Sequence, residues 1–167
     1  MLALALLGFL CVSASANDVQ AKSSSYNGEY GSASGQRFSH SYNQLEGPIT
    51  AIRIRAIASY ISGLQVRYGK SWSDYVGGTY GDLEEIFLYP GESVIQVTGK
   101  YDTYLRKLVF VTNQGRHWSF GGDTGTSFNA APLHPNTVLR FISGRASDYI
   151  YAIGLHWGVD PSSHNSC

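Results

Sequence analysis

The stretch TVLRFISGRASDYIYAIGLHW, residues 137–157, contains two largely apolar runs separated by a polar loop. TVLRFISG and IYAIGLHW each have the length of a β-strand. Glycine is abundant, at 19 residues, and no long segment spaces its apolar residues as an amphipathic helix does. These features predict an all-β fold in which residues 137–157 form a pair of strands.

Two further segments alternate apolar and polar residues as half-buried strands do. ITAIRIR, residues 49–55, has Ile52 and Ile54 on one face and Arg53 and Arg55 on the other. LQVRY, residues 64–68, repeats this alternation. We predict one strand over each segment.

Turn residues divide the middle of the chain into more strands. GDLEEIFLYPGESVIQVTGKY, residues 81–101, is interpreted as two strands joined at Pro90 and Gly91, because proline fixes φ and glycine permits positive φ. LRKLVFVTNQGRHWSFG, residues 105–121, is predicted to form a hairpin around residues 113–115. Short strands at this spacing favour a closed or multi-sheet architecture, and a sandwich and a prism both fit.

The first residues have the pattern of a secretory signal peptide. An apolar run leads to Ala14, Ser15 and Ala16, which fits cleavage after Ala16. The run is shorter than the ~20 apolar residues that a membrane-spanning helix requires. We therefore expect a secreted protein without a transmembrane segment. The predicted divisions are a signal peptide (1–16), an N-terminal segment (17–23), one domain (24–159) and a C-terminal tail (160–167).

Residues 23–35, SSSYNGEYGSASG, allow two interpretations. Their serine and glycine content is typical of a flexible linker. Tyr26 and Tyr30 favour the alternative, an ordered segment that ends in a tight, glycine-lined loop.

The cysteines and the charge balance limit the partners. Cys11 leaves with the signal peptide, so Cys167 has no partner within the mature chain and is either an intermolecular tether or part of a frayed tail. We expect the frayed tail, and hence a monomer. Lysine plus arginine equal aspartate plus glutamate at 12 each, so no net charge favours nucleic acid or an anionic membrane.

We expect no enzyme, no metal site and no cofactor. The five histidines show no H-x-x-x-H spacing, and no cysteine pair accompanies them. Glu84 and Glu85 are adjacent, so on a strand they point to opposite faces and cannot flank one scissile bond. Ser127 lies in GTSFNA without a neighbouring base. A hydrolase site assembled from distant residues stays open as an alternative.

Sugar binding suits the chain better. A shallow sugar site uses backbone amides, a carboxylate that accepts hydroxyl protons and an aromatic wall. Each charge-assisted hydrogen bond to such a carboxylate contributes about 1.5–3 kcal/mol. Tyrosines near predicted loops could stack and hydrogen-bond, and partial burial in a strand is the alternative for each of Tyr30, Tyr101, Tyr104, Tyr149 and Tyr151.

Long ordered stretches over nearly the whole mature chain carry a family resemblance. They include YGSASGQRFSH, GPITAIRIR, WSDYVGG, GDLEEIFL, PGESVIQV, GTSFNA, LHPNTVLRFISGR and AIGLHW. With these stretches the chain resembles the jacalin-related lectins, and residues 24–159 would be the lectin domain. The resemblance implies a β-prism of three four-stranded antiparallel sheets and sugar binding without a metal. It also implies a location in secretory granules or mucus, with glycans or glycoproteins as partners.

In that family the sugar lies between three loops at one end of the prism. The matching segments here are residues 31–35, 102–104 and 144–151. We expect the backbone amides of residues 31–35 and of Tyr104 to matter most. By this match the carbohydrate-binding residues are Gly31, Gly35, Gln36, Asp102, Tyr104, Ser147, Asp148, Tyr149 and Tyr151.

The third loop departs from the family pattern, which ends G-x-x-x-D with the aspartate directly before the A-I-G strand. Here that position is Tyr151, and the position expected to be glycine is Ser147. A literal G-x-x-x-D does occur, but it ends at Asp148, about 10 Å of extended chain too early.

This departure bears on affinity. Two lost charge-assisted hydrogen bonds would cost roughly 3–6 kcal/mol, whereas a millimolar ligand has only about 4 kcal/mol of binding free energy. We therefore expect mannose binding to be weak or absent. The alternative is a reshaped site, in which Tyr149 and Tyr151 stack on a sugar and Asp148 accepts a hydrogen bond from its edge.

Basic residues support a rival function, packaging through sulfated proteoglycan without sugar recognition. The resemblance implies more lysine and arginine in close relatives at the positions of Gln36, Thr79 and Asp102. Arg53 and Arg55 share a strand face that could contact a polyanion, and a solvated strand face is the alternative. The residues assigned to this rival are Arg37, Arg53, Arg55, Lys100, Arg106 and Lys107.

Overall fold

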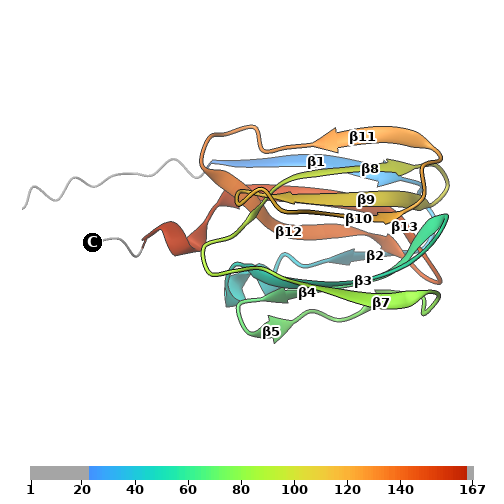
Figure 1. The fold of residues 1–167 in the computed structure, drawn as a ribbon, viewed down its shortest axis with the longest axis horizontal. Helices are drawn as coiled ribbons and strands as arrows, with labels where there is room; N and C mark the ends of the chain where they lie inside the picture. Colours follow the sequence, from blue (N-terminus) through green and yellow to red (C-terminus); the bar gives the residue numbers. More distant parts are fainter. Residues whose placement is uncertain (1–22, 165–167) are drawn as a thin grey trace, which may run out of the picture.

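The computed structural model of the protein describes residues 23–164. These residues form three antiparallel sheets whose strands run along the long axis of the molecule (Figure 1). The predicted signal peptide, the segment before Ser23 and Cys167 lie outside the described residues. Within residues 23–164 we find no helix with the length and apolar character needed to span a bilayer.

Sheets B and C each use one continuous stretch of the chain, whereas sheet A joins strands from the start and the end of the described residues. Sheet A has the order β1-β13-β12-β2, sheet B has the order β5-β4-β3-β7 with β6 also paired to β4, and sheet C has the order β10-β9-β8-β11. The elements are β1 (Ser24–Gly31), β2 (Gln36–Ser39), the 3-10 helix η1 (Asn43–Glu46), β3 (Ile49–Ile57), β4 (Tyr60–Tyr68), β5 (Ser71–Trp72), β6 (Val76–Gly77), β7 (Asp82–Phe87), β8 (Val94–Tyr101), β9 (Leu105–Thr112), β10 (His117–Gly121), β11 (Thr126–Ala130), β12 (Thr137–Ala146), β13 (Ile150–Val159) and the 3-10 helix η2 (Pro161–His164).

The clearest sequence patterns are confirmed. β12 and β13 form the predicted pair, and β9 and β10 form the predicted hairpin. β3 buries Ile52 and Ile54, and it leaves Arg53 and Arg55 partly exposed on the other face. The serine- and glycine-rich segment is strand β1, which pairs with β13, so the linker interpretation is wrong.

The two strands around Pro90 and Gly91 exist but do not pair with each other. β7 pairs with β3 in sheet B, whereas β8 pairs with β9 in sheet C. The turn, in which Gly91 has a φ of 77°, therefore carries the chain from one sheet to the next.

Sheet B departs from the expected four strands at one edge. β5 and β6 are two residues each, and both pair with β4, through Arg67 with Trp72 and through Leu64 with Val76. The expected fourth strand is thus split into two short pieces.

The core lies between the inner faces of the three sheets. Tyr68 of β4, Phe110 of β9 and Trp157 of β13 are among the largest fully buried side chains. Trp157 donates its indole N–H to the Asn27 side-chain oxygen at 2.8 Å, so its polar group is satisfied.

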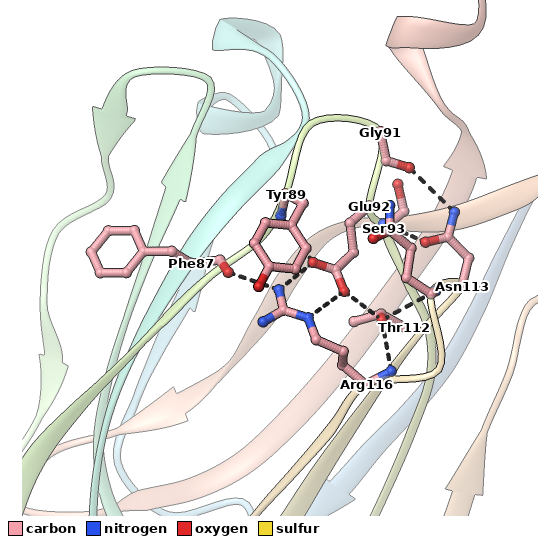
Figure 2. Close-up of polar contacts among 9 residues, drawn as sticks. Phe87, Tyr89, Gly91, Glu92, Ser93, Thr112, Asn113 and Arg116 are labelled. Carbon is pink, nitrogen blue, oxygen red and sulfur yellow. Dashed lines mark hydrogen bonds and ion pairs between the residues drawn. The ribbon is translucent and has the colours of Figure 1, made fainter.

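A buried ion pair joins sheet C to the connection from sheet B (Figure 2). The Glu92 side chain is 0% exposed and accepts hydrogen bonds from Arg116 Nε at 2.8 Å, from the Thr112 hydroxyl at 2.7 Å and from the Tyr89 amide at 2.9 Å. Arg116 also donates to the Phe87 carbonyl at 2.9 Å. The hydrogen bond from Arg116 is the main cause that lowers the pKa of Glu92 to about 2. This cluster holds the connection between β7 and β8 against the end of β9, at the end of the prism where β1 begins and β13 ends (Figure 1).

Candidate functional site

The three loops expected to form the site lie together at the end of the prism opposite the termini (Figure 1). The Ser32 hydroxyl donates to the Thr103 carbonyl at 2.8 Å, which joins the first loop to the second. The Ser32 amide donates to the Tyr151 carbonyl at 3.1 Å, which joins the first loop to the third. Segments far apart in sequence are therefore held as one surface.

The glycines of the first loop are required by close approach and by backbone conformation. Gly31 has a φ of 134°, and a Cβ there would lie 1.9 Å from the Tyr151 carbonyl oxygen. Gly35 has a φ of 74°, and a Cβ there would lie 2.8 Å from Cδ2 of the Tyr151 ring and 3.0 Å from the backbone of Ala146. The side chain that faces Gly35 is therefore Tyr151. Gln36 follows as the exposed first residue of β2.

The third loop is a tight turn at the surface. The Ser147 amide donates to the Tyr149 carbonyl at 3.1 Å, and the Ser147 hydroxyl donates to the Tyr151 phenol oxygen at 3.4 Å. Asp148 is exposed, and its backbone carbonyl packs on Gly78, where a Cβ would lie 2.1 Å from that oxygen. Within residues 23–164 no side chain pairs with the Asp148 carboxylate, so it is available to solvent.

The second loop uses its polar groups internally. Asp102 accepts hydrogen bonds from the Tyr104 amide at 3.1 Å and from Arg106 Nε at 2.8 Å. The hydrogen bond from Arg106 is the main cause that lowers the pKa of Asp102. The Tyr104 amide, which we had expected to face a ligand, is thus already engaged by Asp102.

Five tyrosines gather over the loops, and we name Tyr60, Tyr80, Tyr104, Tyr149 and Tyr151 the tyrosine cluster. Tyr149 lies at its centre, stacked on Tyr80 with ring centroids 5.4 Å apart and the planes at 13°. The centroids of Tyr60 and Tyr104 lie 5.4 Å and 5.3 Å from that of Tyr149. Tyr104 in turn lies 5.2 Å from Tyr151. The cluster is a continuous aromatic surface beside Gly35.

Sequence reasoning found part of this cluster. Tyr104, Tyr149 and Tyr151 are among the residues predicted from sequence, whereas Tyr60 and Tyr80 are not; the sequence signal for these two is their position beside Ser59 and Gly81 at strand ends.

Two other tyrosines that were considered for stacking lie elsewhere. Tyr30 stacks on Phe128 with centroids 4.2 Å apart, and Tyr101 lies 6.2 Å from the same ring. Both pack against the core.

The six cations assigned to polyanion binding are divided among the three sheets and are largely paired. Arg53 contacts Glu85 at 2.6 Å, Arg55 donates to the Gly81 carbonyl at 2.8 Å, and Arg106 is paired with Asp102. Lys107 contacts the Asp123 carboxylate at 2.5 Å, and Lys100 donates to the Asp123 carbonyl at 3.0 Å. Arg37 lies on β2 beside a cavity of about 150 Å³. Binding of a polyanion by these residues stays a prediction.

The structure provides no cluster of three or more histidine, cysteine, aspartate or glutamate side chains suited to a metal within residues 23–164. Glu84 and Glu85 are both exposed on β7, and Glu85 pairs with Arg53.

Three antiparallel sheets around one core, with glycine-lined loops gathered at one end, define the architecture of a β-prism lectin. Residues 27–156 match the Jacalin-like lectin domain, and the chain belongs to this family. Its members are generally carbohydrate-binding proteins without enzymatic activity.

Individual relatives agree with this assignment. The chain is 71% identical to Zymogen granule membrane protein 16 of Homo sapiens, over 100% of both chains. The crystal structure of a prostate-specific WGA16 glycoprotein lectin is similar with a TM-score of 0.71 and 38% identity, over 81% of this chain and 99% of that one. Artocarpin complexed with Me-alpha-mannose has a TM-score of 0.70 and 21% identity, over 81% of this chain and 98% of that one, and shows the fold alone.

Proposed function

We propose that the protein is a secreted lectin of secretory granules or mucus that binds glycans at the loop end of the prism without a metal ion. Membership of the jacalin-like lectin family supports glycan binding. Relatives named for the zymogen granule membrane support an association with granules. The exposed aromatic surface beside the glycine loop offers a place for a sugar ring.

We further propose that the site has an altered specificity, with weakened binding of mannose-type sugars. The observation that carries this proposal is the position of the Tyr151 ring against Gly35. A phenol ring there supplies no carboxylate to accept two hydroxyl protons, and it occupies space beside the amide. Because each charge-assisted hydrogen bond is worth about 1.5–3 kcal/mol, a weak monosaccharide site does not survive the loss of two.

The tyrosine cluster and Asp148 would supply the replacement contacts. Apolar faces of pyranose rings pack on aromatic rings, and phenol hydroxyls hydrogen-bond to the rim of the sugar. Tyr80 is 53% exposed, so part of its surface is open to a ligand. The Asp148 carboxylate lies at the edge of the same surface, close enough to Tyr149 to contribute to its raised pKa, which desolvation mainly causes. Asp148 would accept a hydrogen bond from the edge of a sugar that stacks on the cluster.

A glycan array on the wild type and on Tyr151→Asp tests the proposal. The wild type should bind glycans other than simple mannosides, and the substitution should create mannose binding by restoring an acceptor before the A-I-G strand. If the wild type binds mannose as strongly as Tyr151→Asp does, the proposed specificity is contradicted. If the wild type binds no glycan on the array, the lectin function is contradicted.

Binding of sulfated proteoglycan is the second candidate function. Five of the six cations assigned to this function already contact acceptors within the protein, so little uncompensated positive charge remains to attract a polyanion. Added salt separates the two candidates, because polyanion binding weakens steeply with salt whereas hydroxyl recognition hardly responds.

A further inference from the structure

A groove of about 650 Å³ lies on sheet A, away from the loop end. It is lined by the start of β1 and the end of β13, which pair through Ser24 and Gly158. The tyrosine cluster lies at the other end of these strands, since β13 begins at Ile150, next to Tyr149. The groove is thus separate from the site proposed above.

Glycine makes the outer face of β13 concave. Gly154, His156 and Gly158 alternate on this face, while Leu155 and Trp157 point into the core. A Cβ on Gly158 would have only the Arg140 side chain, at 3.1 Å, and the Ser23 carbonyl, at 3.9 Å, within 4 Å. With no side chain at Gly158, the groove forms a depression that the Arg140 stem borders.

Three rings form an aromatic wall beside the depression. His156 stacks on Phe141 with centroids 4.0 Å apart and planes at 11°, and it lies 4.6 Å from the Tyr26 ring. The His156 ring is hydrogen-bonded through Nε2 to the Ser143 hydroxyl at 2.8 Å. Tyr26 is 47% exposed. In this wall the central ring, His156, is held in place by its contacts, and the outer ring, Tyr26, is partly open to solvent.

The Arg140 guanidinium lies at the other side of the groove. Arg140 donates to the Val159 carbonyl at 2.9 Å and to the Gln44 carbonyl at 3.5 Å, while its Nε has no partner among residues 23–164. The Nε is itself buried, but each terminal nitrogen of the guanidinium carries a second N–H, so these nitrogens have donors left for another ligand. Asp160 lies close enough to raise the pKa of Arg140, and its oxygens also accept hydrogen bonds from Ser93 and Ser162. Burial lowers the pKa of the Arg140 guanidinium, which an added carboxylate would offset.

We propose that this groove is a second glycan site that binds a carboxylated pyranose, with the sugar ring against Tyr26 and Phe141 and the carboxylate on Arg140. The shared chemistry of such ligands is an apolar ring face next to an acid group, found in uronic acids and in sialic acids. Guanidinium groups bind carboxylates in a planar, two-bonded geometry that a neutral sugar cannot provide.

Titration of the full mature chain followed by amide NMR tests the site. The probes are methyl β-D-glucuronide, the methyl α-glycoside of N-acetylneuraminic acid and the neutral methyl β-D-glucoside. We expect chemical-shift changes at Ser24, His156 and Gly158 with at least one acidic probe. The probe that produces them identifies whether the ligand is a uronic acid or a sialic acid. The glucoside should bind roughly ten-fold or more weakly, as expected for the loss of a charge-assisted pair. Equal binding of all three probes, or shifts confined to residues 31–35 and 147–151, would overturn the proposal.

Variants distinguish binding in the groove from binding at the loop end. Arg140→Met should abolish the preference for the acidic probe, and Arg140→Lys should keep the charge but lose most of the affinity. Arg140 also donates hydrogen bonds to two backbone carbonyls, so its substitution could disturb the fold. Tyr26→Ala provides a second test that leaves these hydrogen bonds intact. Tyr26→Ala should weaken the acidic probe several-fold, whereas Tyr80→Ala at the loop end should not. Unchanged binding in Tyr26→Ala, or equal losses in both tyrosine variants, would contradict a separate groove site.

Discussion

The ring of Tyr151 lies against Gly35, with its Cδ2 atom 2.8 Å from the position that a Cβ on Gly35 would take. The two residues belong to β13 and to the loop before β2, and the contact closes the space beside the loop amides. A residue other than glycine at position 35 would meet both this ring and an unfavourable backbone.

Substitution of Gly35 separates these two effects. Gly35 and Gly115 have similar φ values, 74° and 77°, but a Cβ on Gly115 would have nothing within 4 Å. Gly115→Ala should therefore cost about 1–2 kcal/mol from the left-handed backbone alone, and Gly35→Ala should cost more because Ala146 also crowds it. Urea denaturation of both variants checks this difference. Equal losses would mean that the packing around Gly35 adjusts without cost.

Removal of an exposed ring tests the tyrosine cluster as a binding surface. Tyr80→Ala should weaken the best glycan from the array roughly ten-fold, or about 1.4 kcal/mol. The fold should be retained because Tyr80 is 53% exposed. Tyr42→Ala is the matched control, since Tyr42 is 85% exposed and lies outside the cluster. Calorimetric titration gives both affinities, and equal affinities for the two variants would remove Tyr80 from the site.

The Glu92 and Arg116 pair should contribute strongly to stability. Glu92→Gln leaves the Arg116 guanidinium without its acid partner and should cost about 3 kcal/mol, the lower end for breaking a buried pair because Arg116 is partly exposed. Glu84→Gln, on the exposed face of β7, is the control and should change stability little. Unfolding in urea at pH 7 measures both.

The same pair predicts a pH dependence. The folded pKa of Glu92 is lowered to about 2 from 4.5. The stabilisation from its ionised form is therefore fully present above pH 4.5 and is lost as pH falls through about 2. The stability difference between the wild type and Glu92→Gln should narrow over this window. A difference that stays constant would show that the charge of Glu92 contributes little.

His40 predicts a second pH dependence, at higher pH. Burial lowers the pKa of His40 to about 4 from 6.5, and its Nδ1 is hydrogen-bonded to the Tyr68 hydroxyl at 2.8 Å. The unfolded chain takes up this proton first, so stability should fall as pH drops from 6.5 to 4. His40→Gln, which preserves a polar partner for Tyr68, should reduce the slope. Denaturation midpoints at several pH values measure this slope.

Much of the fold was accessible from local patterns. Alternation in β3 and the runs around the β12–β13 loop predicted strands correctly, because one face of each strand meets the core. The pairing partner of β7 was not accessible, because a proline-glycine turn can close a hairpin or connect two sheets. Glu92 directly follows this turn and contacts Arg116, which lies 24 residues further along the chain, so the surroundings of the turn are not visible in the local sequence.

The site was predictable to a smaller extent. The resemblance identified three loops, and the structure brings these loops together. The ring contacts of Tyr60 and Tyr80 could not be read from sequence, because they depend on how sheet B lies beside the β12–β13 turn. The hydrogen bond from the Tyr104 amide to Asp102, in contrast, has the i to i+2 spacing that aspartate favours in turns, so this contact was accessible from sequence although it was not predicted.

The broken edge of sheet B has a consequence for association between molecules. An uninterrupted edge strand exposes a row of amide and carbonyl groups on which another chain can assemble. Here β5 and β6 offer two residues each, β7 at the opposite edge carries Asp82, Glu84 and Glu85, and β1 in sheet A is interrupted between Asn27 and Tyr30. Such edges resist intermolecular strand addition, so sheet B and the β1 edge of sheet A should not act as templates for fibrous aggregates.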